Sequence, residues 1–238
     1  MPWVVHQPPS IKEDNQMIGE NPAPEISFRR YTTEDLRACS ALAEEAWPAG
    51  EEWTDDAQGI LGMEGYIESS LLWSNWADLA CDSQGVMGFL FGRIDKLRGG
   101  ASSTKPFLRE ARLMAGLLLG GKWRGSMMVA MFWSIFLTEL KLMVNIPRSD
   151  AGIELLIVSS KYRGKGIGRI LVDRFVHAVK GAGSSLVTVY TDDLMSNWSF
   201  YEKYGFKRIG SFHDNVTSYF AGKHSNALIY VLDLKAAP

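Results

Sequence analysis

The most constraining feature of this sequence is an apolar, strand-like run that passes through a glycine-rich turn directly into a helix. Residues 153–158 read Ile-Glu-Leu-Leu-Ile-Val, an apolar run with β-branched residues that is typical of a buried strand. The turn that follows contains Gly164, Gly166 and Gly168, and the pattern over 167–180 predicts an amphipathic helix that begins at once. The junction therefore predicts a fold in which strands and helices share one core.

The same junction offers a binding site for an anion. The first N–H groups of a helix lack partners within it, and the helix dipole places partial positive charge there. Glycines let the backbone curl and let a bulky anion approach those groups. Lys161, Arg163, Lys165 and Arg169 flank the turn. We expect a pyrophosphate here, although glycines also serve ordinary turns. The spacing matches neither a P-loop, which needs Gly-Lys-Ser or Gly-Lys-Thr, nor the dinucleotide fingerprint.

The rest of the chain predicts an α/β fold with a mixed sheet. Strands are expected over 26–31, 78–81, 86–94, 153–158, 185–190, 206–212 and 227–234, and helices over 36–46, 63–73, 167–180 and 196–204. The spacing breaks at about 95–149, where two apolar helical segments are expected at about 105–119 and 126–144. We therefore expect one domain over 25–238, with a helical insertion between the third and fourth strands. Residues 1–24, with five prolines among polar residues, predict a flexible arm.

Composition narrows the class of protein. A net charge of -2 gives no field that would gather nucleic acid. The two cysteines, Cys39 and Cys81, have no metal-ligand spacing, so neither a disulfide framework nor a metal site is expected. The first residues lack the apolar segment of a signal peptide, and neither apolar segment of the insertion reaches the roughly 20 residues of a membrane span. A cytoplasmic location is expected.

A second motif gives the first motif its meaning. The sequence Phe-Tyr-Glu-Lys-Tyr-Gly-Phe occupies 200–206, after the helix and the next expected strand. The pairing of this motif with Arg163-x-x-Gly166-x-Gly168 resembles the GNAT superfamily of N-acetyltransferases. The resemblance covers about 150–235, is weaker over 26–94 and does not extend to the insertion. It implies the GNAT acyl-CoA N-acyltransferase fold, with acetyl-CoA as co-substrate and a primary amine, more readily of a small molecule, as acceptor.

The resemblance also implies where the donor binds. In the family, acyl-CoA lies between two parallel strands that splay apart, here 153–158 and 185–190. Backbone groups near Ile157, Val158 and Ser159 would pair with the pantetheine arm. The pyrophosphate would be held at Arg163, Gly164, Lys165, Gly166, Ile167 and Gly168. Many members carry an asparagine seven residues before the motif tyrosine, where this chain has Leu194. Asn197 either substitutes as a contact to the CoA arm or caps the short helix with Ser196.

Candidate catalytic residues follow from the same comparison. Tyr201 matches the family tyrosine that protonates the leaving thiolate, and a phenol stays protonated at neutral pH. Tyr204 lies on roughly the same helix face and is the second candidate. Glu154 interrupts an apolar strand, where it would act as a general base if buried, or form a salt bridge to a basic neighbour. His213 and Asp214 are weaker alternatives for the base.

Three functions remain open at this point. The first is a catalytic N-acetyltransferase for small amines, the second a protein acetyltransferase, and the third a GNAT-fold sensor that binds acyl-CoA without turnover. The apolar insertion either packs on the domain, shapes an acceptor pocket, or forms a homodimer or membrane-surface contact. The acceptor itself does not follow from the sequence.

Overall fold

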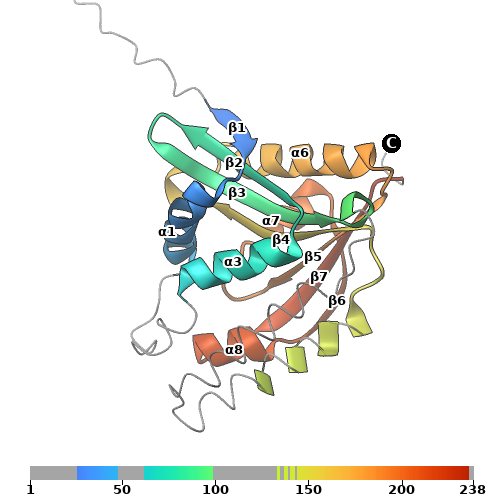
Figure 1. The fold of residues 1–238 in the computed structure, drawn as a ribbon. Coiled ribbons are helices and arrows are strands. Elements are labelled where there is room, and N and C mark those ends of the chain that lie inside the picture. Colours follow the sequence, from blue (N-terminus) through green and yellow to red (C-terminus); the bar gives the residue numbers. More distant parts are fainter. Residues whose placement is uncertain are drawn as a thin grey trace, which may run out of the picture.

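The computed structural model describes residues 26–47, 62–98, 133–134, 137–138, 140–142 and 144–235. These residues form one seven-stranded sheet with the strand order β1-β2-β3-β4-β5-β7-β6 (Figure 1). The strands are β1 (Ser27–Arg30), β2 (Trp76–Asp82), β3 (Gly85–Ile94), β4 (Ala151–Val158), β5 (Leu186–Asp192), β6 (Lys207–His213) and β7 (Asn226–Asp233). Every neighbouring pair is antiparallel except β4 and β5, which run parallel. The predicted mixed sheet is confirmed.

Helices cover both faces of the sheet (Figure 1). The described helices are α1 (Leu36–Ala46), α3 (Met63–Trp73), α6 (Ile167–Gly181), α7 (Ser199–Tyr204) and α8 (Asn215–Ala221). Helices α1 and α3 pack on one face, whereas α6 and α7 pack on the opposite face. The expected helices over 36–46, 63–73 and 167–180 are found, while α7 begins three residues later than expected. Helix α8 was not expected.

Helix α6 shows how its sequence fixes its place. One face of the helix is buried, formed by Ile167, Leu171, Val172, Phe175 and Val179 at helical spacing. Gly92 on β3 lets the Phe175 ring approach closely, because a Cβ at Gly92 would lie 2.5 Å from that ring. This contact sets the helix against the sheet and holds its first turn near the end of β4.

The opposite face has a second core. Cys39 and Ala43 of α1 and Ile67 of α3 are fully buried against Phe89 and Phe91 of β3. The approach to α1 is fixed by an ion pair, in which Asp35 accepts hydrogen bonds from Arg29 and from the Thr32 N–H.

The insertion lies between β3 and β4, as expected. Its described residues between 133 and 145 are helical, and Thr138 is buried. Lys141 Nζ donates to the His213 carbonyl over 3.0 Å, so this helical segment contacts the end of β6. The expected helix at 105–119 and the N-terminal arm lie outside the described residues. Among the helices that are described, none has the length and apolar character to cross a membrane.

Candidate active site

The candidate site begins where β4 and β5 separate. The two strands pair over three positions, from Ala151 opposite Val187 to Ile153 opposite Val189. Within the described chain no later position of β4 pairs with β5, and the strands diverge (Figure 1). Because backbone N–H and C=O groups need partners, strands that part in this way leave groups available to a ligand. This is the separation that the family resemblance implied.

A β-bulge lies at the same level of β4. Phe91 of β3 is opposite Leu155 and Gly92 is opposite Ile153, so Glu154 has no opposite residue. A bulge bends its strand and redirects side chains, and bulges are frequent next to active sites. The bulge directly follows the last residue of β4 that pairs with β5.

The edge of β4 beyond the bulge carries backbone groups that pair with no described strand. The Ser159 N–H donates to the Met87 carbonyl of β3 over 2.9 Å. Bonded and non-bonded pairs alternate along an antiparallel ladder, so Ile157 also bonds to β3. Leu156 and Val158 therefore direct their N–H and C=O groups toward the opening. Of the residues expected to contact pantetheine, Val158 has its backbone groups on this edge, whereas Ile157 and Ser159 have theirs on the β3 side.

The glycine turn that follows is open to an incoming anion. Gly164 has a φ of 76° and Gly166 a φ of 83°, a region that favours glycine, and a Cβ on either would meet no described atom within 4 Å. Several backbone N–H groups donate to no other described residue, namely those of Gly164, Gly166, Ile167, Gly168 and Arg169. A run of free N–H groups at the start of a fifteen-residue helix can bind a phosphate group.

Two basic side chains expected to bind phosphate already contact the chain. Arg163 Nε donates to the Val158 carbonyl over 3.1 Å, which ties the turn to the end of β4. The Lys165 Nζ lies 5.0 Å from the centroid of the Tyr162 ring. Both side chains belong to exposed residues, so they remain accessible to an anion at the turn.

Helix α7 is held close to this turn. A Cβ on Gly168 would lie 3.6 Å from both Val158 Cγ2 and Phe200 Cε2. The start of α6, the end of β4 and the first turn of α7 therefore meet at one point. Tyr201 is the next residue of α7, and its ring lies 5.4 Å from that of Phe200, centroid to centroid.

Tyr201 is the more deeply enclosed of the two tyrosines in the motif. Its side chain is 8% exposed, and its ring packs against Phe206 and Tyr230 with centroid distances of 5.6 and 6.1 Å. Burial raises the pKa of this phenol. Its hydroxyl donates to no other described residue. It is therefore a protonated donor at neutral pH.

Tyr204 and Asn197 are engaged within the chain. The Tyr204 hydroxyl donates to Asp173 Oδ1 of α6 over 2.6 Å, and burial together with this bond raises its pKa. Asn197 Oδ1 accepts a hydrogen bond from the Ser199 hydroxyl at the start of α7. The Asn197 contact is a local one near the helix start, and the Tyr204 contact ties α7 to α6.

Glu154 is more exposed than the sequence suggested and is ion-paired. Its Oε1 lies 3.5 Å from Arg93 Nε, and Arg93 also pairs with Asp95. A Cβ on Gly152 would lie 3.4 Å from Glu154 Oε1 and 3.5 Å from Thr188 Oγ1. The carboxylate thus lies above the short β4–β5 contact, on the sheet face opposite α6. Of the two sequence alternatives, the salt bridge to a basic neighbour is found, whereas the burial expected of a base is not.

Comparison with known proteins assigns this geometry. Residues 136–208 match the family described as acetyltransferase (GNAT) domain. This segment, which holds β4, the glycine turn, α6, β5 and α7, is similar to a GNAT acetyltransferase domain. The similarity supports an acyltransferase activity, for which acetyl-CoA is the co-substrate that fits the matched family. No curated protein sequence matches the chain.

Solved structures of several N-acetyltransferases share the fold at low sequence identity. The PaiA N-acetyltransferase from Thermoplasma acidophilum, in complex with coenzyme A, is 15% identical with a TM-score of 0.52, over 88% of this chain and 99% of that one. An aminoglycoside 6'-N-acetyltransferase complexed with coenzyme A is 15% identical with a TM-score of 0.51, over 89% and 99%. The ribosomal-protein-S18-alanine N-acetyltransferase from Escherichia coli is 13% identical with a TM-score of 0.50, over 90% and 97%. These likenesses support the fold.

The described structure also contains a buried polar cluster that the sequence did not predict. Tyr190 of β5 donates to Asp214 Oδ2 over 2.7 Å, and Asp214, which is fully buried, caps α8 by accepting from the N–H groups of Val216 and Thr217. Asp214 is therefore occupied structurally, which makes it a poor candidate for the base. The sequence did contain a signal for α8. Asp214 is a typical residue before a helix start, and Gly222, eight residues later, is typical of a helix end.

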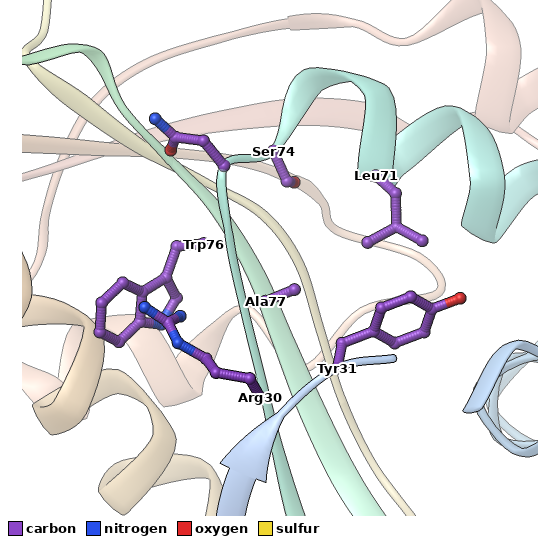
Figure 2. A pocket seen from close by; sticks show the side chains of 7 residues that line it. Arg30, Tyr31, Leu71, Ser74, Trp76 and Ala77 are labelled. Carbon is purple, nitrogen blue, oxygen red and sulfur yellow. The ribbon is translucent and has the colours of Figure 1, made fainter. Parts of the chain in front are cut away.

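A surface depression lies away from this site. It has a volume of about 370 Å³ and lies at the junction of β1, α3 and β2 (Figure 2). The Arg30 guanidinium covers the Trp76 ring, with its central carbon 3.4 Å from the ring centroid, and Tyr31 and Leu71 line the other side. None of the predicted site residues lines it. It does not belong to the candidate active site.

Proposed function

We propose that this protein is an N-acetyltransferase that moves the acetyl group of acetyl-CoA to the primary amine of a small molecule. The observation that carries the proposal is the open glycine turn after the end of β4, whose N–H groups donate to no other described residue, on a strand that parts from β5. An exposed turn of this kind suits the pyrophosphate of coenzyme A. The free edge of β4 beside it suits the amide groups of the pantetheine arm.

In this proposal the donor is held mainly by the backbone. The turn from Gly164 to Gly168 binds the pyrophosphate, and Arg163 and Lys165 add positive charge beside it. Leu156 and Val158 pair with the pantetheine arm, since their backbone groups face the opening. Ile157 and Ser159 bond to β3 and so hold β4 in place beside the donor. Asn197 remains a predicted contact to the CoA arm.

Tyr201 is the proposed general acid. Acetyl-CoA supplies the acetyl group as a thioester. When the amine nitrogen bonds to the acetyl carbon and the carbon–sulfur bond breaks, the leaving sulfur needs a proton, which the Tyr201 hydroxyl supplies. The observed burial and lack of a described acceptor suit this role, because the hydroxyl is protonated and not committed elsewhere. Tyr204 is less suited, because its hydroxyl is bonded to Asp173.

Glu154 is the proposed base. Amines with a pKa near 10 are mostly protonated at neutral pH, so the acceptor must lose a proton before its nitrogen can attack. The Glu154 carboxylate sits at the bulge above the β4–β5 contact and can take that proton directly or through one water. The proposal favours a small acceptor, because the insertion is held against the end of β6 through Lys141 and would restrict a long peptide there. A homodimer stays a prediction.

Calorimetric titration with acetyl-CoA and a thiol-release assay over a panel of amines test this function. We expect binding, and CoA release that depends on a small amine. Tyr201→Phe should lower kcat about 100-fold while leaving the affinity for acetyl-CoA unchanged. Tyr204→Phe is the matched control and should keep kcat within a fewfold of wild type.

The other outcomes would point to other functions. No binding of acetyl-CoA would refute the proposal outright. Binding without release on any amine would identify an acyl-CoA sensor, and release only with peptide amines would identify a protein acetyltransferase. An equal loss in Tyr201→Phe and Tyr204→Phe would remove Tyr201 as the general acid.

A further inference from the structure

The phosphate turn is tied to the β2–β3 hairpin by side chains that the proposed chemistry does not use. The Tyr162 hydroxyl donates to Asp82 Oδ2 over 2.5 Å. Lys161 Nζ donates to Gln84 Oε1 over 2.7 Å. Asp82 in turn accepts from the Gln84 N–H over 2.7 Å, so the hairpin turn is itself fixed. Lys161 and Tyr162, which precede the glycines, thus both bond to the β2–β3 turn, about 80 residues earlier in the chain.

Tyr162 is more than a packing residue. Its side chain is 8% exposed and belongs to the core beneath α6, while its hydroxyl reaches the more exposed Asp82. The Lys161 and Lys165 ammonium groups lie 5.2 and 5.0 Å from its ring centroid. The ring therefore also supports two of the cations that flank the turn.

A second tie comes from α1. Glu45 Oε1 accepts from the Ser160 N–H over 2.5 Å and from the Ser159 hydroxyl over 3.4 Å. Residues Ser160–Tyr162 form a short 3-10 helix, whose first N–H groups would otherwise lack acceptors. The hydrogen bond with Ser160 lowers the pKa of Glu45, and that with Tyr162 lowers the pKa of Asp82. Both carboxyl groups are therefore charged at neutral pH.

We propose that Tyr162, Asp82 and Glu45 are positioning residues that hold the phosphate turn in its donor-binding shape. The turn contains two glycines with positive φ, and glycine loses more conformational freedom on ordering than any other residue. A pyrophosphate gains from several N–H groups only if they converge before it arrives, so anchoring the chain directly before the glycines raises affinity by pre-organisation. This inference rests on the proposed binding of acetyl-CoA at the turn.

The test compares two donors, one of which lacks the pyrophosphate. Acetyl-CoA and acetyl-pantetheine share the thioester and the pantetheine arm, but acetyl-pantetheine cannot use the turn. For Tyr162→Phe, which removes one hydroxyl and keeps the ring, we expect kcat/KM with acetyl-CoA to fall about tenfold. The value with acetyl-pantetheine should stay unchanged, as should kcat at saturating acetyl-CoA.

Glu45→Gln supplies a second variant at an exposed position, where unfolding is not a concern. We expect a smaller loss of the same kind, about threefold with acetyl-CoA alone, because water competes at an exposed bond. Glu44→Gln is the matched control, since it removes the same charge from the next exposed residue of α1, and it should match wild type with both donors.

The result that would overturn the inference is an equal loss with both donors, which would indicate a general structural role, or no loss with either. Failure of the proposed donor site would give a different result. If the wild-type enzyme itself shows no preference for acetyl-CoA over acetyl-pantetheine, then the turn does not bind the pyrophosphate, and the proposed donor site is wrong together with the inference.

Discussion

Glu154 combines three structural features that bear on its proposed role as the base. It is the extra residue of the β4 bulge, it lies at the point where β5 departs, and its carboxylate contacts Arg93. An ion pair at a partly exposed position adds little to stability. Since the carboxylate is accessible and aimed by the bulge, its chemistry offers a better reason for a charge within an apolar strand than does stability.

Glu154→Gln tests that role. We expect kcat to fall about 100-fold at pH 7 with unchanged affinity for acetyl-CoA and an unchanged melting temperature. The deficit should narrow as pH rises toward the amine pKa of about 10, because the acceptor then loses its proton without a base. A pH–rate profile of both enzymes measures this. Asp95→Asn, which removes the other carboxylate on Arg93, is the control, and a Glu154→Gln enzyme with wild-type kcat would exclude the base.

Among the elements, the glycine turn contains two glycines, Gly166 and Gly168, that belong to the same sequence motif but differ in backbone conformation. Gly166 precedes α6 with a φ of 83°, where an L residue is strained, whereas Gly168 lies inside the first turn of the helix and is not among the positive-φ glycines. The Cβ of an alanine at 168 would reach ordinary contact distance from Val158 and Phe200, not the open side of the turn. The backbone geometry therefore predicts different outcomes for the same substitution.

Gly166→Ala should destabilise the protein by about 1–2 kcal/mol and weaken acetyl-CoA binding about tenfold, because the strained residue displaces the free N–H groups. Gly168→Ala should leave both unchanged or stabilise the fold by up to about 1 kcal/mol, because alanine favours helix. Urea unfolding and calorimetric titration measure the two quantities. Equal losses in the two variants would show that room for the ligand, and not backbone strain, decides both positions.

Elements with a strong local pattern were predictable. The alternation and apolar runs gave all seven strands, and the periodic helices α1, α3 and α6 were found within a residue or two. Helix α8 was missed because it is only seven residues long and lacks an apolar stripe, so only its caps marked it. Helix α7 starts at Ser199 and not at 196, because the side chains of Asp192 and Asn197 make local bonds that compete with helix there.

At the scale of the whole molecule, the tertiary contacts of the site could not be predicted from local sequence patterns. The turn and the Tyr201 motif could be predicted, because each is continuous in the sequence. The register that leaves Glu154 unpaired and the bond from Tyr162 to Asp82 depend on how distant segments meet. The partner of Glu154 is likewise fixed by pairing between β3 and β4. Such contacts need the assembled sheet, so residues such as Tyr162 and Glu45 carried no sequence signal of their role.

The assembled fold also predicts how stability depends on pH. Asp35 joins β1 to α1, and its hydrogen bonds from Arg29 and Thr32 lower its pKa to about 2. An unfolded aspartate has a pKa of about 3.9. Because the folded pKa is the lower one, the contribution is complete above the unfolded value and is lost as pH falls through the folded value. Because Arg29 is half exposed, solvent screens part of the interaction with the buried Asp35. The contribution of Asp35 to the free energy of unfolding is then about 2 kcal/mol at neutral pH.

Asp35→Asn should therefore lower the free energy of unfolding by about 2 kcal/mol at pH 7, and the gap from wild type should shrink steadily between about pH 4 and pH 2. Urea unfolding of both proteins across this range measures the gap. Glu34→Gln changes the same charge at the neighbouring exposed residue and should stay within about 0.5 kcal/mol of wild type throughout. A gap for Asp35→Asn that did not depend on pH would assign the loss to packing at the β1–α1 junction, since the bonds from Arg29 and Thr32 both favour the charged carboxylate.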